Sequence, residues 1–300
     1  MRVCISGSTG LVGQALVTEL VQRGCEVAAV RRTIGSCDSG DVYWNVADQT
    51  LDVAALEGFD AVVHLAGESV FGRWTAPKKD RIRESRVRGT ELLAKSIAQL
   101  QRPPKVVIAA SAVGFYGDRG AEVLDESSAS GSGFLAEVSR EWEGAWSALD
   151  TLGTRVCILR LGVVLSTYGG ALKQMRMPLG AAVAGPVGSG EQYMSWISIV
   201  DVVGATLHLM LHEECSGIFN LVGPNPVTAS EFSLILGRVM RRPVLPNMPA
   251  VLARMVFGEM VDQLLLASVR VVPRELSKVG YRFQYPELDS ALEHLLVEGL

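Results

Sequence analysis

The sequence predicts an α/β protein built on a doubly wound parallel sheet, with a smaller, mostly helical C-terminal substrate region. Periodicity predicts this fold class, and composition predicts that the chain folds. In the first half of the 300-residue chain, short β-branched runs alternate with longer amphipathic stretches, which is typical of a parallel sheet covered by helices. Hydrophobic residues make up 48% of the chain and charged residues 20%, which is the composition of a folded globular protein rather than a disordered one.

The expected elements follow from this periodicity in chain order. Strands are expected at 2–6, 26–31, 41–44, 60–65, 105–110 and 155–161, with helices between them at 11–23, 78–100 and 136–150. Further helices are expected near 200–212, 229–240, 249–257 and 287–298. We therefore expect a sheet domain at 1–165, to which 192–222 returns, and a substrate-side region at 166–300. Such sheets bind ligands beyond the carboxyl ends of their strands.

Charge and cysteine usage limit the partners and the location. The net charge of −4 supplies no basic field for nucleic acid or an anionic membrane, so we expect a small-molecule partner instead. The five cysteines are odd in number and never form a CxxC pair, so we expect reduced thiols. The first residues lack a signal-peptide pattern and no apolar run reaches the ~18 residues of a membrane span, which favours a cytoplasmic protein. A monomer and a homodimer both agree with the sequence.

A glycine-rich turn follows the first strand. Gly7, Gly10 and Gly13 lie between strand 2–6 and the helical pattern that begins at Leu11. In this context one glycine permits a tight turn, another lets backbone N–H groups approach a pyrophosphate, and the third allows close packing, while the helix N-terminus adds partial positive charge. The turn therefore predicts a Rossmann-type dinucleotide site; the alternative is an ordinary strand-to-helix turn. A Walker A loop does not fit, because the chain has no Gly-Lys pair.

The end of the second strand indicates which dinucleotide would bind. It ends in Arg31 and Arg32, and no acidic residue lies between Glu26 and Asp38 to accept a ribose 2′-hydroxyl. Two guanidinium groups suit a 2′-phosphate, because their forked donors match its oxygens. We therefore expect NADP(H) rather than NAD; the alternative is that both arginines are exposed loop residues.

Several longer motifs resemble the extended short-chain dehydrogenase/reductase superfamily, and within it an atypical epimerase-like subgroup of the NAD-dependent epimerase/dehydratase type. The resemblance covers essentially the whole chain. It rests on the GxxGxxG turn, on residues 62–67, 111–117 and 185–190, on Arg73-Trp74-Thr75, Glu84-Ser85-Arg86 and Ser195-Trp196-Ile197, and on a C-terminal module at 273–276, 280–283 and 285–288.

The resemblance implies which residues would contact the cofactor. Besides the glycines and the two arginines, these are Leu65 and Ala66 at the end of a strand, with Arg86 and Arg160 completing the site. Leu65 and Ala66 have strand-end packing as their alternative role, and Arg86 has a place on a solvated helix face. Arg160 interrupts an apolar strand, and a buried arginine needs an anionic or acceptor partner.

The chain departs from the superfamily where acid–base chemistry is expected. Hydride-transferring members use a Ser or Thr with a Tyr-x-x-x-Lys pair, in which the lysine lowers the pKa of the tyrosine. No tyrosine of this chain has a lysine four residues later, and the expected positions hold Ala136 and Arg140. Ser111 and Tyr116 are the remaining catalytic candidates, as a hydrogen-bond donor and a replacement acid; strand capping and aromatic packing are their alternatives.

The remaining patterns favour packing over chemistry. His208 and His212 have a spacing that can hold zinc, but an apolar helix and the lack of a third ligand favour a core helix, so we expect no metal. Trp74, Trp196 and the 185–190 loop are candidates to line a substrate cleft, with packing as their alternative.

Two functional hypotheses follow from these motifs. The first is an NADP(H)-binding oxidoreductase or epimerase-like protein that acts on an unidentified small molecule. The second is a non-catalytic NADP(H)-binding regulator or scaffold that has lost the acid–base pair.

Overall fold

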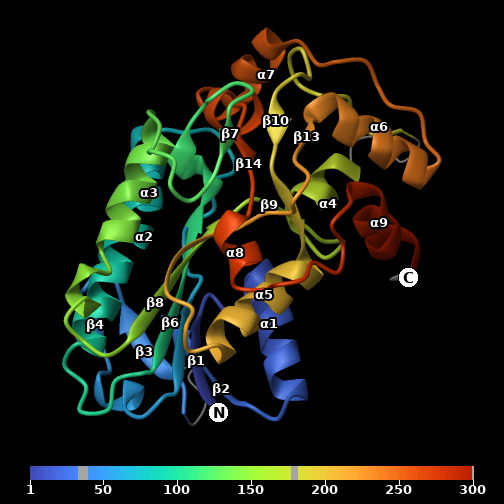
Figure 1. The fold of residues 1–300 in the computed structure, drawn as a ribbon. Helices are drawn as coiled ribbons and strands as arrows, with labels where there is room; N and C mark the ends of the chain where they lie inside the picture. Colours follow the sequence, from blue (N-terminus) through green and yellow to red (C-terminus); the bar gives the residue numbers. More distant parts are fainter. Residues whose placement is uncertain (33–39, 177–181, 299–300) are drawn as a thin grey trace.

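A large, mainly parallel sheet forms the centre of the protein (Figure 1). The structure is a computed structural model that describes residues 1–32, 40–176 and 182–298. The strand order is β12-β8-β6-β5-β1-β2-β3-β4, and every neighbouring pair is parallel except β3 and β4. From β1, the next strands in the chain (β2, β3 and β4) are added on one side of the sheet, whereas β6, β8 and β12 are added on the other side, beyond β5. The strand order therefore reverses between β1 and β5. The predicted doubly wound α/β fold is confirmed.

The strands of this sheet lie close to the predicted runs. They are β1 (Arg2–Ser6), β2 (Glu26–Arg31), β3 (Val42–Asn45), β4 (Thr50–Leu51), β5 (Ala61–His64), β6 (Val106–Ala112), β8 (Arg155–Leu161) and β12 (Gly217–Leu221). The sequence predicts the first strands well, because β-branched residues alternate with helices there. It does not predict β12, since five residues with one β-branched side chain carry little periodicity.

Helices cover both faces of the sheet (Figure 1). The helices α1 (Leu11–Gln22) and α5 (Ile199–Leu211) lie on one face, and α2 (Ala76–Ile97), α3 (Phe134–Gly144) and the 3-10 turn η4 (Ser147–Leu149) lie on the other. Hydroxyl groups start two of them: Thr75 accepts a hydrogen bond from Lys78 N–H at the start of α2, and Ser198 accepts one from Val200 N–H at the start of α5. The predicted helix 136–150 ends earlier, at Gly144.

Each face of the sheet has its own core, because successive side chains of a strand point to opposite faces. Val3 and Ile5 of β1 pack toward α1 and α5, whereas Cys4 between them packs with Trp44 and Trp146 on the other face. All three residues of β1 are fully buried. The burial of both faces explains why these strands are continuous hydrophobic runs.

Most of the C-terminal region lies beyond the carboxyl ends of the strands, in the upper part of Figure 1, whereas residues 274–278 lie lower in the view and pack against β12. Its short strand pairs are β9 (Val163–Leu165) with β11 (Trp196–Ser198), β10 (Tyr193–Met194) with β13 (Val227–Thr228), and β14 (Arg270–Val271) with β7 (Val123–Leu124). Its helices are α4 (Gly170–Arg176), α6 (Ala229–Met240), α7 (Ala250–Phe257), α8 (Arg274–Lys278) and α9 (Leu288–Glu293). Two π-helical turns also lie in this region, at Val261–Leu265 and His294–Glu298, and two 3-10 turns lie earlier in the chain, at Ala54–Leu56 and Val113–Tyr116. In the described ranges, no helix combines the length and apolar character needed to cross a bilayer.

Candidate functional site

The glycine turn between β1 and α1 is packed too tightly for other residues. Gly7 has a φ of +73°, and Gly10 N–H donates a hydrogen bond to Gly7 O at 2.9 Å. A Cβ atom at Gly13 would lie 2.2 Å from Gly7 O, so α1 can approach the turn only without a side chain there. Helix α1 starts at Leu11 with neither a side-chain cap nor an acidic residue in its first turn. Its first N–H groups and positive dipole end are therefore available to an anion.

The residues after β5 form the opposite wall. A Cβ atom at Gly7 would lie 2.8 Å from the carbonyl carbon of Leu65 and 2.9 Å from the nitrogen of Ala66. Ala66 N–H donates to Ser6 Oγ at 3.3 Å, and Leu65 N–H donates to Ser6 O at 3.1 Å. The structure thus brings the predicted residues Gly7, Leu65 and Ala66 together where the strand order reverses, which is where doubly wound sheets bind ligands. We call this place the crevice.

His64 lies directly beneath the crevice but is not exposed to it. Its Nδ1 is 2.7 Å from Ser6 Oγ, and its ring makes edge contacts with Trp44 and Trp146. Complete burial lowers the pKa of His64 to about 4, so the ring is neutral at neutral pH. It therefore belongs to the core and is not a catalytic acid.

The two arginines at the end of β2 lie in different environments. Arg31 Nε donates to Asp41 Oδ2 at 3.0 Å, whereas Arg32 is exposed. Asp41 also accepts a hydrogen bond from Ala29 N–H at 2.8 Å. Asp41 could not be recognised from the sequence, because its place beside Arg31 depends on the pairing of β2 with β3. Residues 33–39, which include Cys37, lie outside the described residues.

Arg86 lies beside the wall formed by the residues after β5. Its NH1 group donates to the carbonyls of Glu68 (2.9 Å) and Ile82 (3.2 Å), and the guanidinium lies over the Trp142 ring at 5.1 Å. A Cβ atom at Gly67 would be 3.3 Å from the guanidinium carbon. Burial lowers the pKa of Arg86 to about 10, and the charge of Glu68 only partly offsets this effect. Arg86 is therefore not on a solvated helix face.

The Glu84-Ser85-Arg86 motif holds the segment that follows β5. Ser85 Oγ accepts a hydrogen bond from Glu68 N–H at 3.0 Å, while Arg86 binds the carbonyl of Glu68. Lys78 Nζ donates to Glu68 Oε1 at 2.6 Å, and this bond lowers the pKa of the carboxyl. Glu68 is thus held at its N–H, its carbonyl and its side chain. Through these bonds, Ser85 and Arg86 hold the backbone of the segment that follows Leu65 and Ala66.

Ser111, Arg160 and Asn220 form a polar row across three neighbouring strands, because they are register partners on β6, β8 and β12. All three are at most 2% exposed. Glu143 of α3 covers the row: its carboxylate accepts hydrogen bonds from Arg160 Nε at 2.8 Å and Arg160 NH2 at 2.7 Å, and from Ser111 Oγ at 2.6 Å. Burial acts to lower the pKa of Arg160, but the hydrogen bonds and charge of Glu143 outweigh it and raise the pKa above its usual value.

The contacts within this row bear on the predicted roles of Arg160 and Ser111. The anionic partner that Arg160 requires is Glu143 within the protein, so Arg160 needs no cofactor phosphate to compensate its charge. Ser111 directs its hydroxyl proton to the same carboxylate. Glu143 could not be recognised from the sequence, because that requires knowing how α3 is rotated against the sheet.

Tyr116 completes the row instead of lying open to a substrate. Its side chain is fully buried, and its hydroxyl accepts a hydrogen bond from Arg160 NH1 at 2.9 Å. Two acceptors compete for its proton, Asn220 Oδ1 at 2.8 Å and the carbonyl of Asp125 at 3.0 Å. Burial raises the pKa of Tyr116. The structure therefore favours the packing alternative over a replacement acid.

The positions of the usual Tyr-x-x-x-Lys pair have other roles. Ala136 is 1% exposed and packs inside α3. Arg140 is exposed, and its NH1 group donates to Ser130 Oγ and the carbonyl of Gly131. Neither residue supplies a proton near the crevice.

The C-terminal region packs against the segment that follows β5 and against the start of α3. Met260 Sδ accepts a hydrogen bond from Gly72 N–H at 3.1 Å, and Gln263 Oε1 accepts one from Leu135 N–H at 3.0 Å. Trp74 and Met260 belong to one buried cluster, and Trp74 donates its indole N–H to the carbonyl of Val70. Trp196 is 1% exposed, so packing describes both tryptophans better than a cleft lining does.

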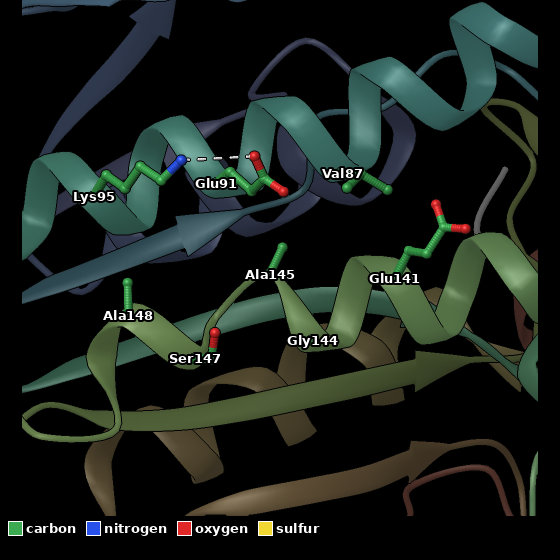
Figure 2. A pocket seen from close by; sticks show the side chains of 8 residues that line it. All are labelled: Val87, Glu91, Lys95, Glu141, Gly144, Ala145, Ser147 and Ala148. Carbon is green, nitrogen blue, oxygen red and sulfur yellow. Dashed lines mark ion pairs between the residues drawn. The ribbon is translucent and has the colours of Figure 1, made fainter.

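Two concavities in the described residues lie away from the crevice. Figure 2 shows the first, of about 330 Å³, between α2 and the end of α3, where Lys95 reaches along α2 toward Glu91. The second, of about 540 Å³, is lined by residues that include Met1, Lys105 and Arg155, at the amino ends of β1, β6 and β8. Neither contains a predicted site residue.

Histidines and cysteines form no metal centre in the part of the chain that the structure describes. His208 uses Nε2 to contact the carbonyl of Val279 at 2.9 Å, and its ring stacks on His212. Cys4, Cys25, Cys157 and Cys215 are free thiols. Burial raises the pKa of Cys4 and of Cys157 to about 12, so neither is a reactive thiolate.

Comparison with known proteins identifies the family. The NAD dependent epimerase/dehydratase family matches residues 3–222. This chain belongs to that family. A domain of unknown function, DUF1731, matches residues 248–295, which include α7, Met260 and Gln263.

Curated members of the epimerase family align along almost the whole chain. An epimerase family protein of Mycobacterium leprae is 37% identical over 97% of this chain and 94% of its own length. The human epimerase family protein SDR39U1 is 34% identical over 99% of this chain and 100% of its own length. A crystal structure of human SDR39U1 (isoform 2) with NADPH superposes with a TM-score of 0.91, at 33% identity and full coverage of both chains.

More distant epimerases share the fold alone. The UDP-glucose 4-epimerase of Thermus thermophilus, solved with NAD, has a TM-score of 0.74 at 20% identity and covers 99% of this chain and 98% of its own. Its substrate therefore carries no argument for this protein.

Proposed function

We propose that this protein binds NADP(H) in the crevice and acts as an oxidoreductase or epimerase on a small molecule. The observation that carries the proposal is the glycine turn at the reversal of strand order, where Gly7 and Gly13 leave no room for a Cβ atom. A turn this tight, followed by a helix start without acidic residues, fits a pyrophosphate held by backbone N–H groups.

The choice of NADP(H) over NAD rests on two independent arguments. β2 ends at Arg31 and Arg32 follows it, where a 2′-phosphate would lie, and no acidic residue follows them directly in the sequence. The human relative with a TM-score of 0.91 was solved with NADPH. Leu65 and Ala66 would form the opposite side of the site. We propose Arg86 as a further cofactor residue, because it lies beside Gly67 with a desolvated charge.

The cofactor, when bound, would accept or donate a hydride. The residues of this chain would orient it, since the wall after β5 is held at Glu68 by Ser85, Arg86 and Lys78. The reaction also needs a group that donates or accepts a proton, and among the described residues we identify no such group at the crevice. Water is the proton donor or acceptor that we propose for this step.

The second candidate function is a non-catalytic NADP(H)-binding regulator or scaffold. A specific observation favours it: both catalytic candidates are bound within the polar row, Ser111 to Glu143 and Tyr116 to Arg160. A regulator needs cofactor retention but no proton transfer. The net charge of −4 and the free thiols support a cytoplasmic location and a small-molecule partner for either function.

Titration with NADPH and NADH tests the proposal, using the intrinsic fluorescence of the five tryptophans at fixed salt. We expect NADPH to bind at least about tenfold more tightly, which corresponds to about 1.4 kcal/mol. An Arg31→Ala, Arg32→Ala double variant should lose this preference. Failure of both nucleotides to bind would show that the glycine turn is only architecture.

Turnover separates the two candidate functions. Carbonyl compounds are added to the NADPH-bound protein, and the NADPH absorbance is followed over time. Oxidation of NADPH by any of them supports the enzyme. Tight retention of NADPH without turnover across sugar, aldehyde and ketone classes supports the regulator.

A further inference from the structure

Asp41 occupies a place that the linear sequence does not reveal. It directly precedes β3, and the pairing of β2 with β3 brings it next to the end of β2. Its Oδ1 accepts a hydrogen bond from Ala29 N–H at 2.8 Å, and its Oδ2 accepts one from Arg31 Nε at 3.0 Å. The Asp41 side chain is 9% exposed and that of Arg31 is 31% exposed. One carboxylate thus ties the Arg31 side chain to the strand backbone.

We propose that Asp41 is a positioning residue that selects NADP(H) over NAD(H) by orienting Arg31 for the 2′-phosphate. This inference rests on the proposed function. Asp41 holds the Nε atom, at the base of the guanidinium fork, and this contact leaves the two terminal nitrogens for a phosphate. A pre-oriented fork loses less conformational freedom when it binds a phosphate than a free side chain does.

The burial of Asp41 explains why an acidic residue here would not select NAD(H). An acidic residue that favours NAD(H) must offer a free carboxylate oxygen to the ribose 2′-hydroxyl. Asp41 binds the backbone with one oxygen and Arg31 with the other, and it is almost inaccessible to solvent. The carboxylate also reduces the local positive charge, which acts against phosphate binding. We infer that orientation outweighs this charge effect, because the Nε contact is direct and partly shielded from water.

Two variants test this role from opposite sides of the contact. Asp41→Asn keeps the size of the side chain but presents an amide N–H₂ to a donor. Arg31→Lys keeps the positive charge but removes Nε, and it leaves the bond between Asp41 and Ala29 intact. We expect each variant to raise the Kd of NADPH about five- to tenfold, as the loss of part of a charge-assisted contact would, and to change the Kd of NADH less than about twofold. The double variant should lose no more than Arg31→Lys alone.

Asp60→Asn is the matched control. Asp60 also accepts a backbone hydrogen bond, from Arg2 N–H at 2.7 Å, but it directly precedes β5, at the amino ends of β5 and β1 and away from Arg31. This variant should bind both nucleotides as the wild type does.

Three results would overturn the inference, and they are distinguishable. Unchanged or tighter NADPH binding by Asp41→Asn would mean that the charge effect dominates. Equal weakening of NADPH and NADH would mean that Asp41 only supports the fold. Failure of the wild type to bind either nucleotide would overturn the proposed function as well, whereas the first two results leave NADP(H) binding intact.

Discussion

Removal of Glu143 should destabilise the protein strongly, because it leaves a buried charge without a partner. The carboxylate of Glu143 accepts three hydrogen bonds of 2.6–2.8 Å, two from Arg160 and one from Ser111. The side chains of the ion pair are 2% and 10% exposed. Breaking a buried pair of this kind lowers the free energy of unfolding by about 3–5 kcal/mol. For 300 residues, at ~2.1 cal/mol/K per residue, this corresponds to a Tm lower by roughly 5–8 °C.

Urea unfolding and thermal unfolding of a Glu143→Leu variant measure this loss. A double variant, Glu143→Leu with Arg160→Met, should recover most of the stability, because replacing both charges by apolar groups removes the uncompensated one. Glu84→Gln is the control: Glu84 also pairs with an arginine on a helix, at 3.1 Å from Arg88, but both side chains are exposed. It should change the free energy of unfolding by less than about 0.5 kcal/mol. A loss below about 1 kcal/mol for Glu143→Leu, or a double variant less stable than the single one, would refute the reasoning.

Three further changes have defined outcomes. The pKa of His64 is about 4 in the folded chain and 6.5 ordinarily. The contribution of His64 to the free energy of unfolding should therefore be fully present above pH 6.5. It should fall by up to about 3 kcal/mol as the pH drops toward 4, at about 1.36 kcal/mol per pKa unit. In urea unfolding, the free energy of His64→Gln should depend less on pH than that of the wild type. Gly13→Ala places a methyl group 2.2 Å from a carbonyl oxygen and should weaken NADPH binding at least about tenfold, whereas Gly144→Ala, with nothing within 4 Å, should bind normally in the same fluorescence titration. Thr228→Ala removes the capping box that Thr228 forms with Glu231 in α6 and should lower the free energy of unfolding by about 1 kcal/mol in urea; an unchanged midpoint would show that packing alone holds this helix.

Features encoded by neighbouring residues could be predicted from the sequence. The glycine turn is one, because its strand, turn and helix are contiguous and each glycine has a local steric reason. The ends of β1, β2 and β8 are others, because β-branched runs define them. The wall residues Leu65 and Ala66 came from the family resemblance, and the structure places them against Gly7.

Features that depend on long-range pairing could not be predicted. Asp41 lies beside Arg31 only after β3 pairs with β2, and Glu143 reaches Arg160 only through the rotation of α3. The orientation of Tyr116 was equally hidden, because a position just after a strand does not say to which side a loop residue turns. The sequence identified the right residue types near the crevice, but the charges that compensate them come from other elements.

The contacts of Met260 indicate whether the chain can be truncated at the boundary between its two family matches. Met260 lies within the segment matched by DUF1731, yet it is fully buried in one cluster with Trp74 and Ile82 from the epimerase/dehydratase segment. Lys79 and Glu259 add an ion pair of 2.5 Å across the same boundary. A truncation before residue 248 would leave an indole and a branched side chain of α2 facing water. The boundary between the two sequence families is therefore not a boundary of independent folding, and the shorter chain should aggregate on expression rather than form a soluble nucleotide-binding domain.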